Sequence, residues 1–148
     1  MNCKGNYFRN FAAKFRVMID FKTVTPQDRL LFERFHDLMS QIKNAESSLA
    51  NLCAYSFLYH GEYAVVEDCL AVRIYFDEKT VCYHYPLGEG NKNEVLKLLK
   101  EDARARGFIM MLICGDTVPP ESIRGAFDPV LRCDFFDYLY LREDLHNL

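Results

Sequence analysis

The sequence predicts an α/β (α+β) fold in which a mixed sheet is flanked by helices, and three patterns carry this prediction. Apolar residues alternate along residues 70–76, the period of two that a half-buried strand requires. Residues 92–106 carry an apolar stripe at helical spacing. Residues 108–114 are seven consecutive apolar residues bounded by Gly107 and Gly115, which predicts a central strand buried on both faces. A helix between two strands allows them to be parallel, so we expect 108–114 to run parallel to its predecessor.

The first elements begin after residue 17. Residues 19–24 predict a short opening strand. Thr25 and Pro26 then begin a helix as N-cap and first helical residue, where the missing N–H of proline is harmless. Its apolar stripe comprises Leu31, Phe35, Leu38 and Ile42. A second helix is expected over 49–59, ended by His60 and Gly61.

The remaining elements follow at short spacing. Residues 63–67, 70–76 and 81–85 predict three antiparallel strands, because the connections between them are short. The helix over 92–106 ends at Gly107. After the apolar strand, Pro119 and Pro120 precede a short helix to about residue 127, and residues 135–141 predict a last strand. The chain is organised as an extension (1–17) and one domain (18–148).

Composition limits the classes of function. The chain has 148 residues and a mass of 17.3 kDa, and half of it is apolar, so one domain can bury a core. Four of the 18 basic residues precede the first acidic residue, Asp20, so the body carries 14 basic against 21 acidic side chains. An acidic body binds a phosphate backbone poorly, which argues against DNA as a partner.

The N-terminus and the cysteines bear on location. The apolar runs are too short to span a bilayer, and the six cysteines form no C-x-x-C pair, so we predict a cytoplasmic protein. Two interpretations of residues 1–17 stay open. They form a loosely ordered extension, or they form an amphipathic helix that contacts an anionic membrane through Phe8, Phe11 and Phe15.

The order of the elements resembles the acetyltransferase-like (GNAT) fold of enzymes that transfer acyl groups from coenzyme A. In that family a Q/R-x-x-G-x-G/A loop before a helix holds the pyrophosphate of the cofactor. Here Gly88 and Gly90 match the loop, whereas Tyr85 replaces Gln or Arg and Glu89 adds a negative charge. The resemblance implies that a coenzyme A-type donor would contact Tyr85, Gly88, Gly90, Asn91 and Lys92. The alternative is a glycine-rich turn without a ligand.

Other groups provide candidate chemistry without a decisive pattern. Cys82 and His84 share one strand face, but no further ligands stand at usable spacing, so we predict no metal site. Cys114 ends the apolar strand and is either a nucleophile or an ordinary core cysteine. No residue is assigned as catalytic, although several could act as acid or base: Glu67, Asp68, His84, Tyr138 and Tyr140.

A closer resemblance rests on E-S-S-L-A-N-L-C-A-Y (46–55), F-F-D-Y-L-Y (135–140) and the opening M-I-D-F-K-T-V-T-P-Q-D (18–28). These stretches resemble bacterial proteins related to the C-terminal domain of phosphatidylglycerol lysyltransferase. That family joins two acetyltransferase-like halves in tandem and transfers aminoacyl groups from charged transfer RNA.

The match to the first half implies a half-domain that is not catalytically complete by itself. Its expected partner is a second such half, or another copy in a homodimer. An active acyl- or aminoacyltransferase using coenzyme A or aminoacyl-tRNA is the alternative, and a small-ligand sensor on the same scaffold is a third.

Overall fold

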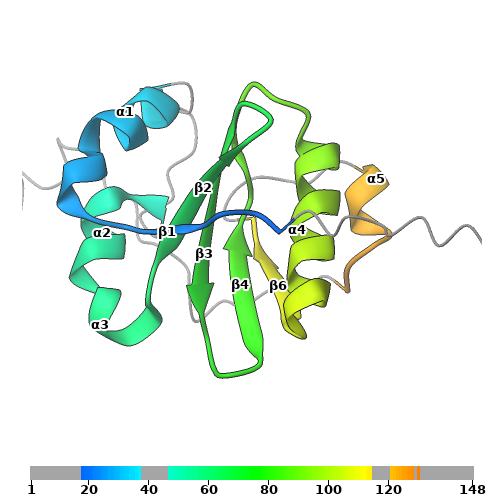
Figure 1. Cartoon of the computed structure of the whole chain (residues 1–148). Helices are drawn as coiled ribbons and strands as arrows, with labels where there is room; N and C mark the ends of the chain where they lie inside the picture. The colour runs from blue at the N-terminus through cyan, green and yellow to red at the C-terminus, as the bar shows by residue number, and fades with distance from the viewer. Residues whose placement is uncertain (1–17, 38–46, 115–120, 129, 131–148) are drawn as a thin grey trace, which may run out of the picture.

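The structure is a computed structural model that describes residues 18–37, 47–114, 121–128 and 130. Its elements follow the predicted order of strand, helices, strands, helix, strand and helix (Figure 1). In chain order they are β1 (Lys22–Thr23), the 3-10 helix η1 (Pro26–Asp28), α1 (Arg29–Asp37), α2 (Leu49–Ala54), α3 (Ser56–Tyr59), β2 (Glu62–Val66), β3 (Cys69–Tyr75), β4 (Thr80–His84), β5 (Leu87–Gly88), α4 (Lys92–Arg106), β6 (Ile109–Ile113) and α5 (Glu121–Arg124).

One mixed sheet organises these elements, with the strand order β1-β2-β3-β4-β6. The pairs from β1 to β4 are antiparallel, and β4 pairs with β6 in parallel. β5 pairs with the first residues of β3. The predicted fold class, the antiparallel meander and the parallel pair joined by a helix are therefore confirmed.

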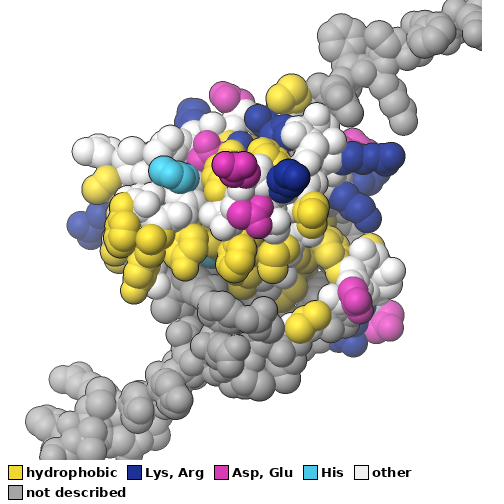
Figure 2. Space-filling view, turned by 90° about the horizontal axis from the view of Figure 1, so that it is seen from below, with side chains coloured by type: hydrophobic (Ala, Val, Ile, Leu, Met, Phe, Trp, Pro, Cys, Tyr) yellow, Lys and Arg dark blue, Asp and Glu magenta, His cyan; other side chains and the backbone are white. Residues whose placement is uncertain are grey.

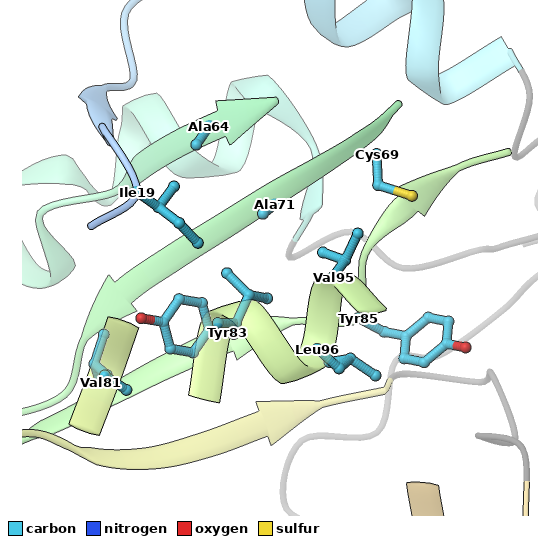
Figure 3. Close-up of a cluster of buried hydrophobic side chains, with 11 residues drawn as sticks. Ile19, Ala64, Cys69, Ala71, Val81, Tyr83, Tyr85, Val95 and Leu96 are labelled. Atoms are coloured by element: carbon cyan, nitrogen blue, oxygen red, sulfur yellow. The ribbon is translucent and has the colours of Figure 1, made fainter. Parts of the chain in front are cut away.

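Helices cover both faces of the sheet, α4 on one side and α1 to α3 on the other (Figure 1). The α4 face holds a core that contains Val95, Val81 and Tyr83 (Figure 3), together with Leu99. On the other face Phe32 and Phe35 of α1 are buried in a second core, with these partners from other elements: Val24, Leu52, Tyr63, Leu70, Val72 and Leu87.

The position of β6 differs from the prediction. We expected a central strand buried on both faces, but among the described strands β6 has one neighbour, β4. Ile109 and Met111 are 63% and 42% exposed. The apolar run therefore reflects contact with α4 on one face only, and the prediction of a central strand is wrong for the described sheet.

Two further boundaries differ from the prediction. The opening strand is limited to β1, and the second helix breaks at Tyr55 into α2 and α3. At the break Ser56 Oγ donates to the carbonyl of Cys53, a local bond that competes with a continuous helix. The expected strand over 135–141, the extension 1–17 and the end of the first helix at Leu38 and Ile42 lie outside the described residues.

The described helices bear on membrane insertion. None of those in residues 18–37, 47–114 and 121–128 combines the length and the apolar character that crossing a bilayer requires.

Candidate functional site

The loop that the sequence singled out joins β4 to α4 and crosses over the turn between β2 and β3. That turn places Glu67 and Asp68 in the left-handed region, with φ of 47° and 56°. β5 lies beside it because Gly88 pairs with Cys69. The two glycines of the loop therefore face a neighbouring backbone.

Close approach explains why both positions are glycine. A Cβ added at Gly90 would lie 1.6 Å from the carbonyl oxygen of Glu67, and one at Gly88 would lie 2.3 Å from that of Asp68. Gly88 also has a φ of 140°, which side chains rarely allow. The spacing of the glycines is thus accounted for by packing between the two loops.

The polar groups of the loop have partners within the chain. The Gly90 N–H donates to the sulfur of Cys69, and Lys92 Nζ donates to the carbonyl of Gly88. The side chain of Asn91 caps α4 by accepting from the Glu94 N–H, 3.3 Å away. Of the groups that would hold a pyrophosphate, these three are engaged internally.

Tyr85 occupies the position where the acetyltransferase loop has Gln or Arg. Its side chain is 7% exposed and packs in the α4 core with Val95 and Leu96 (Figure 3). Burial raises the pKa of Tyr85. The five predicted residues thus lie between the end of β4 and the first residue of α4, and their contact with a coenzyme A-type donor stays a prediction.

A buried charge cluster, which the sequence analysis did not single out, lies between α4 and the sheet. Asp102 is fully buried and accepts hydrogen bonds from Arg73 Nη1 and Arg106 Nε, both at 3.1 Å. Arg73 Nε donates to Glu62 at 2.6 Å. Burial lowers the pKa of Arg73, but the hydrogen bond to Glu62 and other contacts raise it by more. The net effect is a raised pKa, so the guanidinium stays charged.

The same cluster fixes the N-terminal segment. Asp102 Oδ1 accepts the N–H of Ile19 at 3.1 Å, and Arg106 Nη2 donates to the Ile19 carbonyl at 3.0 Å. The guanidinium of Arg73 lies 3.9 Å from the ring centre of Phe21. The i, i+4 spacing of Asp102 and Arg106 is the pattern that could have indicated the cluster, although it does not identify Arg73 as the distant partner.

A second buried polar pair lies on the opposite face of the sheet. Ser47 Oγ and His84 Nδ1 are 2.9 Å apart, and within the part of the chain that the structure describes His84 Nε2 has no hydrogen-bond partner. Burial lowers the pKa of His84 to about 4. A neutral, enclosed imidazole of low basicity is poorly suited to general base catalysis.

Neither Cys82 nor Cys114 has the surroundings that its candidate role requires. Cys82 and His84 share a sheet face, as predicted, but no metal-binding group of three or more ligands exists among the described residues. Burial raises the pKa of the Cys114 thiol, which disfavours the thiolate that a nucleophile needs. Its environment is that of a core cysteine.

Comparison with known proteins gives a structural likeness. No protein-family model matches the sequence, and no curated protein is similar to it. The chain is similar to a crystal structure of a conserved protein of unknown function from Bacteroides thetaiotaomicron, with 34% identity and a TM-score of 0.59. The match covers 64% of this chain and 31% of that one, so the chain spans about a third of the length of its structural relative.

The contact between the two loops predicts that a side chain destabilises the protein more at Gly90 than at Gly61. Gly90→Ala should lower the free energy of unfolding by about 1–3 kcal/mol, because the new methyl group must displace a backbone carbonyl. Gly61→Ala is the matched control, since its Cβ would meet side chains at 3.5 Å or more, an ordinary contact. Urea unfolding of both variants measures the difference, and equal effects would contradict the packing explanation.

The lowered pKa of His84 predicts that the protein loses stability in mild acid. The unfolded imidazole titrates near pH 6.5 and the folded one near pH 4, so between these values only the unfolded state gains the proton. The free energy of unfolding should fall as pH drops through this window, by up to about 1.4 kcal/mol per pH unit. His84→Gln should reduce that slope, whereas His60→Gln, at an exposed site, should retain it. Urea unfolding between pH 7 and pH 4 provides the measurement.

Proposed function

We propose that the chain is an acetyltransferase-like half-domain that is not catalytically complete by itself and functions by packing against a second unit of the same kind. The observation that carries this proposal is an apolar surface on the sheet face opposite α4. We call it the open face and define it by Phe76, Ile109 and Met111.

The register of the strands places these side chains together. Ile109 and Met111 lie opposite Thr80 and Cys82 in the parallel pair, and Phe76 continues the same face of β3 beyond Ile74. Their exposed fractions are 63%, 42% and 59%, in the order Ile109, Met111 and Phe76. Seen from below, hydrophobic side chains gather in a band across the molecule, with charged side chains above it and at its right-hand end (Figure 2).

Large hydrophobic side chains that are exposed together are characteristic of an interface. A single exposed side chain would need no explanation, but here two strands contribute to one uncharged surface. The charged groups nearest in sequence, Asp77 and Lys79, belong to the turn that borders this surface. The pattern of an apolar centre with a polar border is the one that protein interfaces show.

The internal hydrogen bonds and the negative charge of the predicted donor loop support the same proposal. Gly90 N–H, Lys92 Nζ and the Asn91 side chain are bonded within the chain, and Glu89 would repel a pyrophosphate. The structural relative is about three times as long as the part that this chain matches, which leaves room for a second unit in that protein.

An active acyl- or aminoacyltransferase is the second candidate. It is supported by the position of the loop, which follows β4 at the carboxyl end of the parallel pair, where ligands of α/β proteins bind. Its donor would be coenzyme A or an aminoacyl-tRNA. The internal contacts of the loop make this candidate the weaker of the two.

In a solution of the pure chain, the second unit available to the open face is another copy. We therefore expect reversible self-association in sedimentation velocity as the protein concentration rises. Met111→Ser removes apolar area from the face and should weaken association by about tenfold, which corresponds to about 1.4 kcal/mol. Leu30→Ser, at an 80% exposed position on α1, is the control and should leave the association unchanged.

Two results would contradict the proposal. A chain that stays monomeric at every concentration has no second unit on its open face. Micromolar binding of coenzyme A by the monomer in calorimetry, strengthened by Glu89→Gln, would favour the transferase instead.

A further inference from the structure

The short helix α3 and the residue before it present large apolar side chains to the surface. Phe57 and Leu58 are 73% and 54% exposed, and Tyr55 and Tyr59 beside them are exposed as well. We call these four side chains the aromatic patch. None of them belongs to either of the two buried cores of the described residues.

The aromatic patch is unusual for a helix. Most helices in proteins are stabilised by packing an apolar face against the core, and a single turn is marginal by itself. The four residues of α3 include no buried one, and the turn is closed by a bond from the His60 N–H to the Ser56 carbonyl at 3.2 Å. Large side chains gathered on such a turn are suited to contact with another molecule.

The aromatic patch and the open face share one side of the molecule. The helices α1 to α3 lie on the sheet face opposite α4, which is also the face that carries the open face (Figure 1). Both α3 and the turn between β3 and β4 lie towards the lower end of Figure 1, and Figure 2 looks onto that end. One partner can therefore contact both surfaces.

The open face by itself is small for a stable dimer. A large side chain has roughly 150–250 Å² to bury, so its three residues expose on the order of 300 Å². A stable interface buries about 800 Å² on each partner. The aromatic patch adds on the order of 400 Å², which brings the apolar area to most of that value.

The charge around the aromatic patch favours a protein partner over a lipid surface. Residues 47–61 contain no Lys, Arg, Asp or Glu. Segments that bind an anionic bilayer carry Lys and Arg beside their apolar side chains, and this stretch carries neither. The open face is likewise uncharged, so the two surfaces match in chemistry.

The two surfaces also complement each other in architecture. In the described part of the chain no helix covers Ile109 and Met111, and the exposed face of a sheet is normally covered by a helix. A two-fold axis that runs between two neighbouring surfaces brings each onto the other, so the contact occurs twice with the roles exchanged.

We propose that two copies of the chain pair reciprocally, with the aromatic patch of each copy covering the open face of the other. The inference rests on the proposed function, because it specifies how the second unit covers the open face. It adds α3 as the element that the partner contributes.

Substitution within the aromatic patch tests its part in association. Phe57→Ser should weaken self-association by at least about tenfold in sedimentation velocity, as Met111→Ser does. Leu30→Ser, on α1, is again the control. Because Phe57 lies outside both cores, its variant should keep the urea midpoint of the unaltered chain at concentrations where both are monomeric.

A mixture of two charged variants tests the reciprocal arrangement. Phe57→Glu and Ile109→Lys should each associate at least about a hundredfold more weakly than the unaltered chain, because each places an unpaired charge in both contacts. An equimolar mixture should associate within about tenfold of the unaltered chain. In the mixed pair one contact sets the introduced glutamate against the introduced lysine, and the other keeps the original residues.

The outcomes separate this inference from the proposed function. An unaltered chain that stays monomeric contradicts both. Association that Met111→Ser weakens and Phe57→Ser does not would keep the open face as an interface and overturn the reciprocal contact. A mixture that associates no better than its two components would overturn it as well, because each surface then packs against its own copy. Binding to vesicles of anionic phospholipid that Phe57→Ser abolishes would overturn it by assigning the aromatic patch to a membrane.

Discussion

The buried carboxylate of Asp102 is the constraint on which the rest of the structure depends. A buried charge is tolerated only when partners replace the water it has lost. Here the partners come from three places: Arg73 in the sheet, Arg106 on the same helix, and the backbone of Ile19 ahead of β1. The angle and position of α4 are therefore set by geometry that an apolar contact alone would leave adjustable.

The placement of α4 determines which surfaces remain for function. Because α4 covers one face of β4 and β6, it positions the loop that precedes it and brings that loop onto the turn at Glu67 and Asp68. On the other face α1 and α2 pack over β2, β3 and β5. Ile109 and Met111 are left exposed there, and the open face results from this uneven cover.

The sequence was informative for features that depend on residues close together in the chain. Alternation in β3, the end of α4 at Gly107, and the parallel connection to β6 follow from neighbouring residues, and the structure confirms them. It was misleading for β6, because an apolar run reveals contact with α4 but does not reveal that, in the described part of the chain, no helix covers the second face. Gly88 and Gly90 matched a cofactor loop, yet the carbonyls of Asp68 and Glu67, distant in the sequence, explain them. The partners of Asp102 lie up to 83 residues from it in the sequence, and no local pattern pairs them with it.

A double-mutant cycle between Arg73 and Asp102 tests most directly whether this cluster holds the fold together. Arg73→Met and Asp102→Leu should each lower the free energy of unfolding by up to about 3–5 kcal/mol, because each removes one partner of a buried charge. The loss is limited because Asp102 keeps its bond to Arg106 and Arg73 keeps its bond to Glu62. The double variant should lose less than the sum of the two by a coupling energy of about 1–3 kcal/mol, since it removes both charges of the pair. Additive losses in urea unfolding would show that the two charges act separately and would contradict the account.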